Sequence, residues 1–345
     1  MKIGLTFDLK TDWPCGADDP HDANAEFDAP ATVDMLERAI ASGGHTVERI
    51  GNVRQLIPRL DSLDVDIVFN VCEGRSGRNR ESQVPVLLEM YGIPYVGADA
   101  LTLGLTLDKV MAKKVFLGEG IRTPRFYQTD DPATADELNT MEYPLIVKTR
   151  HEGSSKGLDG GSRVENAAQL QDRVRHITGR YHQPALVEEY VSGKEFTVAV
   201  LGNRQPLAMP VVQISIEGKV DFEREIYTHA LICSTALKYI CPPAIPAEQV
   251  REIQDMAVRV FRAVDCRDMA RIDFRMDAAG RPYVLEINPL PTLDETDVFH
   301  IFPKIFGLDF NGTINIILNL ALSRYRLIEL DEKDILRPFL TETAV

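Results

Sequence analysis

Residues 269–289 read MARIDFRMDAAGRPYVLEINP, two apolar-rich runs on either side of a polar turn at 277–280. A short turn of this kind between two strand-like runs is typical of a β-hairpin. If Met276 pairs with Arg281, the two runs align along their whole length. The sequence therefore predicts two antiparallel strands with a defined set of facing side chains.

The two faces of this hairpin differ in chemistry, because successive side chains of a strand point to opposite faces. In the predicted register Arg271 lies opposite Glu286 and Asp273 opposite Val284. One face is predicted to enter a core and carries Ile272, Phe274, Met276, Leu285 and Ile287. The other is predicted to gather Arg271, Asp273, Glu286 and Asn288.

The polar face carries oxygen ligands of the type that Mg²⁺ prefers, and Mg²⁺ usually combines one or two carboxylates with phosphates and water. Glu286 is placed to bridge two ions, with Asp273 and Asn288 each binding one. The alternative is a solvated face with a cross-strand Arg–Glu pair. The Asn-Pro-Leu-Pro stretch that begins at Asn288 favours the functional interpretation, since it fixes the backbone directly after the ligands.

A second segment, LIVKTRHEGSSKG at 145–157, joins a buried strand to a loop rich in Gly and Ser. Backbone N–H groups of such a loop can bind phosphates, and Lys148 adds a point charge. The segment is not a Walker A motif, and a plain surface loop is the alternative.

A third segment, LVEEYVSGKEF at 186–196, contains two strand-like runs separated by a short break. Glu188 and Glu195 lie near this break, where a carboxylate can accept from an adenine amino group or from ribose hydroxyls. An exposed acidic strand edge is the alternative.

Upstream of these segments, residues 1–105 alternate apolar runs with helical stretches, which predicts a parallel sheet with helices on its faces. Between 209 and 243 the pattern is irregular and predicts a long loop or flap. Strong helical periodicity returns at 248–264 and 313–325. The tail after about Leu330 is expected to be peripheral.

The composition of the 345-residue chain sets limits on its partners. A net charge of -14 disfavours nucleic acid and anionic membranes. The first residues predict a strand rather than a leader, and no run approaches the length of a bilayer span, so we expect a cytoplasmic protein. The five cysteines show no metal-site spacing and are interpreted as small apolar filler.

Taken in order, several segments of the chain resemble the ATP-grasp superfamily, and within it the D-alanine–D-alanine ligases. The segments are NAEFDAPATV, FNVCEGRSG, GIPYVG, LDKVMAKKVF, IVKTRHEGSSKG, VEEYVSGKEFTVAVLG and RIDFRMDAAGRPYVLEINPLP. The resemblance implies an α/β fold of three α/β domains, with ATP between the central and C-terminal ones. The expected bounds are 1–105, 106–190 and 191–330, with a tail at 331–345, and a homodimer is possible by the same resemblance.

The resemblance also implies roles for single residues. Lys109 and Lys148 match the family's phosphate-binding lysines, and Ser155 matches the serine of the loop that covers the phosphates. Glu188 matches the acid on the adenine side, Glu189 and Val191 match the hinge, and Glu195 matches the acid that binds the ribose. The magnesium ligands are matched by Asp273, Glu286 and Asn288, with Mn²⁺ as a possible substitute for Mg²⁺. The arginine that stabilises the acyl phosphate is matched by Arg271, and the residues that hold the first amino acid by Glu26 and Ser154.

The substrate half departs from the family pattern. Glu73 replaces a histidine, Thr292 a glycine and Asp297 the serine expected to hold the second substrate's carboxylate. Arg78 and Arg80 fall in a loop that is acidic in the family. Tyr227 is only a partial match to the flap tyrosine. These departures predict a different amino acid or amine substrate, with Asp297 repelling a free carboxylate and the two arginines attracting an anion; the alternative is that all three lie outside the pocket.

The resemblance implies an ATP-dependent ligase that activates a carboxylate as an acyl phosphate and joins it to an amine, forming an amide. Two other functions stay open from the sequence. One is an ATP-grasp kinase that stops at a phosphoryl product, and the other is a non-catalytic nucleotide-binding module.

Overall fold

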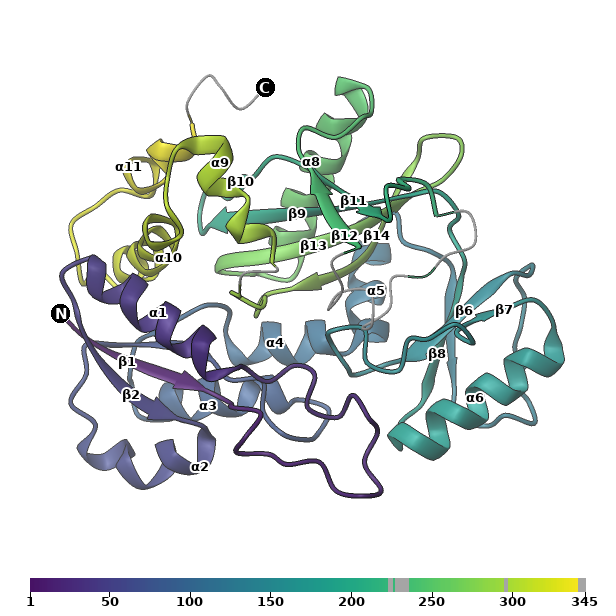
Figure 1. The fold of residues 1–345 in the computed structure, drawn as a ribbon, viewed down its shortest axis with the longest axis horizontal. Helices are drawn as coiled ribbons and strands as arrows, with labels where there is room; N and C mark the ends of the chain where they lie inside the picture. The colour runs from purple at the N-terminus through teal and green to yellow at the C-terminus, as the bar shows by residue number, and fades with distance from the viewer. Residues whose placement is uncertain (223–225, 227–235, 295–296, 341–345) are drawn as a thin grey trace.

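The computed structural model describes residues 1–222, 226, 236–294 and 297–340. In this part of the chain the strands form three sheets (Figure 1). Figure 1 shows the first sheet at the lower left, the second at the lower right and the third above them. The expected α/β fold is therefore observed, whereas the domain bounds stay a prediction.

The first sheet is parallel, with strand order β2-β1-β3-β4. Its strands are β1 (Lys2–Phe7), β2 (Thr46–Gly51), β3 (Ile67–Val71) and β4 (Tyr95–Val96). The helical elements between them are α1 (Pro30–Ser42), α2 (Val53–Leu56), η1 (Ile57–Ser62), η2 (Arg80–Ser82) and α3 (Gln83–Met90). All of β3 is buried, as expected of a strand covered on both faces. The parallel sheet predicted for 1–105 is confirmed.

Two consecutive helices, α4 (Ala100–Leu107) and α5 (Lys109–Gly118), lead from the first sheet to the second. Asp108 lies between the two in an extended conformation, and its carboxylate accepts from the backbone N–H of Met111 at 3.2 Å. A cap of this type ends one helix and begins the next.

The second sheet is antiparallel, with strand order β5-β8-β6-β7. Its elements are β5 (Phe126–Thr129), β6 (Leu145–Thr149), β7 (Arg163–Val164), α6 (Ala167–Tyr181) and β8 (Ala185–Glu189). The Gly-Ser loop follows β6 directly, as predicted, so this sheet delivers both Lys148 and the loop to the same place.

The third sheet contains β9 (Lys194–Gly202), β10 (Leu207–Ala208), β11 (Val212–Ile216), β12 (Leu237–Ile240), β13 (Asp268–Met276) and β14 (Pro282–Asn288). Helix α8 (Ala247–Ala263) packs against it. The prediction of a long loop at 209–243 was wrong for β11 and β12. Every side chain of β11 is buried, including Gln213 and Ser215, so pairing with β9 and β12 overrides the polar composition.

The β13–β14 hairpin has a register different from the predicted one. Met276 lies opposite Pro282 rather than Arg281, and Asp273 lies opposite Glu286. The register shifts directly after Asp273, because Leu285 is an extra residue between the partners of Asp273 and Phe274. An extra residue of this kind is a β-bulge.

The bulge changes which side chains share a face. Val284 is buried in the core, whereas Leu285 lines a cavity next to Glu286. The prediction that Leu285 points into the core was therefore wrong. Arg271 now lies opposite Asn288, and the polar group predicted for this face is kept.

The last elements are η3 (Val298–His300), α9 (Phe302–Phe306), α10 (Phe310–Arg324), α11 (Glu332–Leu336) and η4 (Arg337–Phe339). Helix α10 packs against α1 and against β9 and β13, so one hydrophobic core joins the first and third sheets. Ile335, Leu336 and Phe339 are buried in this core. The expectation of a peripheral tail after Leu330 was wrong for this stretch, because three apolar residues anchor it.

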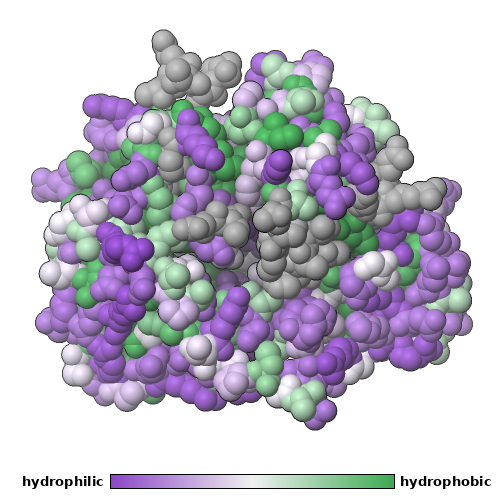
Figure 2. Space-filling view, viewed as in Figure 1, coloured by the Kyte–Doolittle hydropathy of each residue, from purple (hydrophilic) through white to green (hydrophobic). Residues whose placement is uncertain are grey.

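No single helix in the described ranges is long and apolar enough to span a membrane; the bent pair Val298–Phe306 and Phe310–Arg324 meets the length and composition test only together. Figure 2 shows one face of the molecule, which is mostly hydrophilic with apolar residues in small groups.

A buried carboxylate connects these parts. Asp268, at the start of β13, accepts from Arg324 of α10 at 2.7 Å, from the backbone N–H of Gly97 at 2.8 Å and from Asn203 at 3.1 Å. We expect Asp268→Asn to lower the free energy of unfolding by about 3 kcal/mol, because it leaves the buried guanidinium without its counter-ion. Urea unfolding measures this.

Asp265→Asn is the matched control, since the side chain of Asp265 is 87% exposed and pairs only with Arg267, at 3.5 Å. Its loss is expected to stay below about 0.5 kcal/mol. Equal effects of the two variants would contradict the role given to Asp268.

Candidate active site

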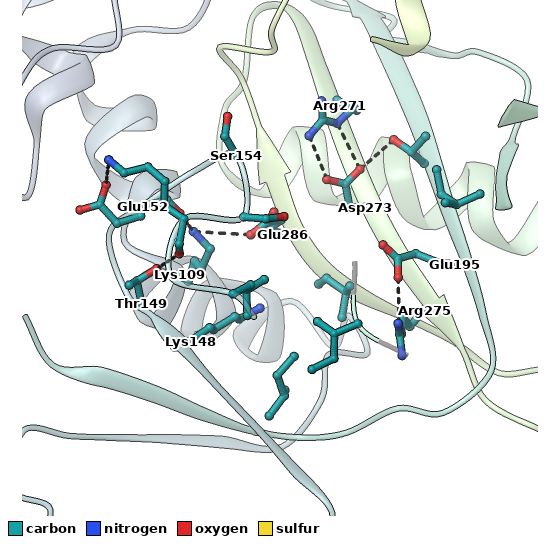
Figure 3. Close-up of a pocket in the computed structure, with 18 of the residues that line it drawn as sticks. Lys109, Lys148, Thr149, Glu152, Ser154, Glu195, Arg271, Asp273, Arg275 and Glu286 are labelled. Atoms are coloured by element: carbon teal, nitrogen blue, oxygen red, sulfur yellow. Dashed lines mark hydrogen bonds and ion pairs between the residues drawn. The ribbon is translucent and has the colours of Figure 1, made fainter. Parts of the chain in front are cut away.

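A cavity of about 270 Å³ lies between the second and third sheets (Figure 3). It is lined by side chains from β6, the β6–β7 loop, the end of β8, and strands β9, β13 and β14. Most of the candidate residues line it: Lys109, Lys148, Ser154, Ser155, Glu188, Glu189, Val191, Glu195, Arg271, Asp273, Glu286 and Asp297.

A second cavity, of about 40 Å³, lies beside the first. Four candidate residues line both cavities, namely Lys109, Ser154, Arg271 and Glu286. Glu26, Glu73 and Asn288 line only the smaller one. The two cavities therefore meet at a lysine, an arginine and a carboxylate.

The three predicted magnesium ligands lie together on adjacent strands. Thr197 donates to one oxygen of Asp273 at 2.7 Å, and the amide of Asn288 donates to the other at 3.1 Å. Glu286 lies 3.5 Å from the ammonium of Lys109 (Figure 3). Within the described ranges, no group of three or more His, Cys, Asp or Glu side chains is arranged as a metal site. Two carboxylates and an amide oxygen nevertheless fit Mg²⁺, which takes further ligands from phosphates and water.

Lys148 is held by a buried ion pair. Its ammonium lies 2.7 Å from one oxygen of Glu188, and the ammonium of Lys113 lies 2.5 Å from the other. Both oxygens of Glu188 are thus occupied, and its side chain is only 1% exposed. In this structure Glu188 positions Lys148, whereas the predicted contact with adenine stays a prediction.

The pKa values in this group reflect burial and charge. Burial lowers the pKa of Lys113 to about 8, although Glu188 opposes the shift. Burial also acts to lower the pKa of Lys148, but Glu188 and Glu286 outweigh it and raise that pKa. Conversely, burial would raise the pKa of Glu188, and the two lysines hold it below its usual value. Lys148 is therefore a permanent cation beside the cavity.

Two further contacts fix the hinge side of the cavity. Arg275 donates to Glu195 at 3.0 Å and to the carbonyl of Val191 at 3.0 Å (Figure 3). Burial raises the pKa of Glu195, and Arg275 only partly offsets this. Glu189 lines the same wall, so the hinge residues predicted from the sequence are brought together.

The Gly-Ser loop has an unusual backbone. Ser154 and Ser155 both have positive φ, at 48° and 56°, a region that residues other than Gly seldom adopt. Such strain is retained where the surrounding structure enforces it, often at a functional site. Both serines face the large cavity, as predicted.

Glu26 is saturated by partners inside the protein. Its carboxylate accepts from Arg80 at 2.5 Å, from Lys156 at 2.9 Å and from the backbone N–H of Gly153 at 2.6 Å. Burial would raise the pKa of Glu26, but Arg80 and Lys156 outweigh it and lower the pKa to about 2. The predicted anion-attracting role of Arg80 does not fit this geometry, because its charge is used on Glu26 and it lines neither cavity.

Arg78 and Asp297 are likewise paired. Arg78 is more than half exposed and lies 2.7 Å from Asp108, outside both cavities. Asp297 is buried, lies 2.6 Å from Arg271 and accepts from the N–H of Phe299 at 3.2 Å. Burial raises the pKa of Asp297 to about 6 despite Arg271. Its ion pair weakens the argument that Asp297 repels a substrate carboxylate. Tyr227 lies outside the described residues.

Sequence reasoning missed several charged residues of the site, among them Lys113, Lys156, Arg275 and Glu81. Each follows a candidate at a spacing that places it nearby. Lys113 is one helical turn after Lys109, and Arg275 shares a strand face with Asp273. These signals were available, but only the fold shows which partners they meet.

A family model described as the D-ala D-ala ligase C-terminus matches residues 118–319, more than half of the chain. The chain belongs to the D-alanine–D-alanine ligase family. A D-alanine–D-alanine ligase of Moorella thermoacetica is 31% identical over 293 residues, which cover 82% of this chain and 91% of that relative. An uncharacterised protein of Sinorhizobium fredii is 37% identical over 259 residues, 75% of each chain.

Solved structures agree on the ligase family's fold. A D-alanine–D-alanine ligase of Bacillus anthracis superposes with a TM-score of 0.72 at 20% identity, over 95% of this chain and 99% of that chain. The same enzyme complexed with ATP gives 0.71. The VanG D-Ala:D-Ser ligase of Enterococcus faecalis gives 0.71 at 22% identity, over 93% and 99%. The predicted ATP-grasp fold and the assignment as an ATP-dependent carboxylate–amine ligase are confirmed.

The charge on Glu26 contributes to stability. Because its pKa is about 2 in the folded protein against a usual 4.5, its contribution is fully present above pH 4.5 and is lost as the pH falls through 2. We expect Glu26→Gln to lower the free energy of unfolding at pH 7 by about 3 kcal/mol. Denaturant unfolding across pH tests this, and a pH-independent loss would contradict it.

Glu81 is expected to behave in the opposite way. Burial raises its pKa to about 7, so the charged form costs stability above pH 7, and this cost fades as the pH falls towards 4.5. We expect Glu81→Gln to raise the free energy of unfolding at pH 8 by up to about 3 kcal/mol.

The exposed Glu119 gives the control variant Glu119→Gln, with an expected change within about 0.5 kcal/mol. The same unfolding series at pH 8 and pH 5 measures all three variants. A loss of stability in Glu81→Gln at pH 8 would contradict the account.

Proposed function

We propose that ATP binds in the large cavity, with its phosphates against Lys109, Lys148 and the Gly-Ser loop. The geometry supports this placement, because Lys109, Lys148 and the Gly-Ser loop line the cavity together with the hinge residues 189–191 and Glu195. The cations and the loop N–H groups are assigned to the phosphate end, and the hinge residues to the other end. The relation to ATP-dependent ligases supports the choice of nucleotide. The adenine and ribose ends are assigned to the hinge and to Glu195 by the same argument.

Asp273, Glu286 and Asn288 are the proposed ligands of two Mg²⁺ ions, with Mn²⁺ as a substitute. When bound, the ions would neutralise charge that develops on the phosphates. The chain's own residues act on the same charge, because Lys109 and Lys148 face the cavity beside Glu286. The serines of the loop restrict access of water to this end.

The proposed reaction begins with a substrate carboxylate in the smaller cavity. One of its oxygens attacks the γ-phosphorus of ATP, the bond to the bridging oxygen breaks, and ADP leaves. A neutral amine then attacks the acyl carbon, phosphate leaves with the bonding pair, and the amine's proton passes to solvent or to a nearby base. Arg271 stabilises the oxyanion, as positioned donors do in acyl transfer.

The observation that carries this proposal is that the two cavities share Lys109, Ser154, Arg271 and Glu286. A nucleotide in the larger cavity and an acid in the smaller one would meet beside a lysine, an arginine and a magnesium ligand. This arrangement places the two reacting groups next to one another, which accounts for much of the rate of a two-substrate reaction.

The substrates are proposed to be small amino acids or amines. Several relatives are D-alanine–D-alanine ligases, but this chain departs from the pattern that the resemblance implies at Glu73 and Thr292, which line the smaller cavity, and at Asp297, which lines the larger one. We therefore propose that D-alanine is not both donor and acceptor. A homodimer, a cytoplasmic location and the absence of nucleic-acid and membrane partners stay predictions.

Lys148→Met tests the site and the reaction together. ATP turnover is measured with Mg²⁺ over single amino acids of both hands and their pairs, with products identified by mass spectrometry. We expect ADP, phosphate and an amide from the wild type, and a fall of at least about 100-fold in the variant, because a buried cation at the phosphates is lost. Chelation of Mg²⁺ should abolish turnover.

Glu119→Gln is the control, since Glu119 is exposed and lines neither cavity. Its turnover should stay within about threefold of the wild type. A stable phosphoryl product would instead support a kinase, and unchanged turnover in Lys148→Met would contradict the proposed phosphate site.

A further inference from the structure

We propose that Glu73 and Glu81 form the binding site for an ammonium group of the acid that is activated. The inference rests on the proposed function, because only that function makes this acid the substrate that is phosphorylated. Glu73 and Glu81 are not among the residues that the sequence linked to catalysis. In this proposal they select a donor acid that carries an ammonium group.

The first argument is pairing. Glu26, which the resemblance assigns to the amino group, has its carboxylate occupied by Arg80, Lys156 and Gly153. Glu73 and Glu81 line the same small cavity, and neither makes a hydrogen bond or ion pair within the described ranges. Glu81 is nonetheless only 8% exposed. A buried carboxylate without a partner is costly, and a cationic ligand removes that cost.

The backbone brings these two carboxylates together. Gly74 has a φ of +73°, and a Cβ at this position would lie 2.5 Å from the carbonyl oxygen of Arg80. The N–H of Gly74 also donates to Asp8 at 2.9 Å. The residues next to these two, Glu73 and Glu81, are therefore held on neighbouring backbone segments that pack in direct contact.

The charge and size of the cavity select an ammonium. Its walls carry five carboxylates and two cationic side chains, and two further cations, Arg80 and Lys156, bind Glu26 from behind. If all of these groups are ionised, the carboxylates outnumber the four cations by one. Burial raises the pKa of Glu73 and Glu81, and an ammonium bound between them would favour their ionised forms. The cavity, of about 40 Å³, is much smaller than the neighbouring one of about 270 Å³, which suits an ammonium on a short chain. No metal-type cluster exists here among the described residues.

The chemistry of the reaction decides which substrate supplies this group. The amine of the acceptor must be neutral to attack the acyl phosphate, whereas two carboxylates stabilise a protonated amine. The site therefore suits an ammonium that does not react, which is the one carried by the donor acid.

The kinetic test compares acids that differ only in this group, namely D- and L-alanine against D- and L-lactate. With ATP, Mg²⁺ and an acceptor amine that supports turnover, we expect ADP release with alanine and at least tenfold less with lactate. Glu73→Gln and Glu81→Gln should each raise the KM for alanine at least tenfold, leave the KM for ATP within threefold, and reduce the preference over lactate. Glu119→Gln should change none of these. An undiminished preference in both variants would overturn the proposal.

A binding test keeps the proposal separate from the ligase reaction. Thermal unfolding is followed in 100 mM ethylammonium chloride and in 100 mM sodium chloride. A ligand that binds only the folded state raises the midpoint. We expect a rise of at least one degree with ethylammonium in the wild type and in Glu119→Gln, and its loss in Glu73→Gln and Glu81→Gln. If alanine fails to elicit ADP release but this pattern holds, the reaction assignment fails and the ammonium site stands. No difference between the two salts in the wild type overturns the site.

Discussion

The pairing of Asp273 with Glu286 across β13 and β14 is the constraint on which the rest of the site depends. The bulge at Leu285 holds both carboxylates on the cavity face while Val284 and Ile287 stay in the core. The same strands carry Arg271 and Asn288, so one hairpin supplies the metal ligands and the guanidinium. Helix α8 and the buried face of the hairpin share a hydrophobic core, which gives these polar groups a rigid base.

The charges around this hairpin are compensated unevenly. Glu188, Glu26 and Asp297 each have a cationic partner within 3 Å. Asp268, which lines neither cavity, is likewise paired with Arg324. Glu73 and Glu81 are the exception among the carboxylates of the smaller cavity. Burial raises the pKa of both although Arg80 opposes the shift, and in the described part of the chain no cation forms an ion pair with either. Cations of the protein thus pair with the carboxylates of the nucleotide half, whereas the donor end of the site keeps two carboxyl groups without an ion pair among the described residues.

The sequence was sufficient for the parts of the fold that follow from local pattern. The parallel first sheet, helix α8 and the hairpin could be predicted because their periodicity and turn residues are strong. Strands β11 and β12 could not, since their place in the sheet comes from pairing rather than from their own composition: β11 pairs with β9, and β12 pairs with β11. The bulge at Leu285 has no local signal either, and it reversed the orientation of that side chain.

For the site, the sequence indicated which types of residue lie near the cavities, but not which of the charged side chains form ion pairs with one another. Asp297 and Arg80 were interpreted from their charge alone, and the structure shows that each is neutralised, by Arg271 and by Glu26. Lys113 was overlooked because a lysine on an amphipathic helix is normally exposed, whereas this one is fully buried on Glu188. Partners far apart in the sequence decide such cases.

The central claim is that a carboxylate is activated by phosphorylation at the junction of the two cavities. Transfer of oxygen-18 tests it most directly. The protein is incubated with ATP, Mg²⁺, an amine and an acid labelled with oxygen-18 in its carboxylate, and the released phosphate is analysed by mass spectrometry. The account predicts one labelled oxygen in each phosphate, because the attacking oxygen stays with phosphorus when the amine displaces it. Unlabelled phosphate formed alongside the amide would contradict an acyl phosphate and the site built around it.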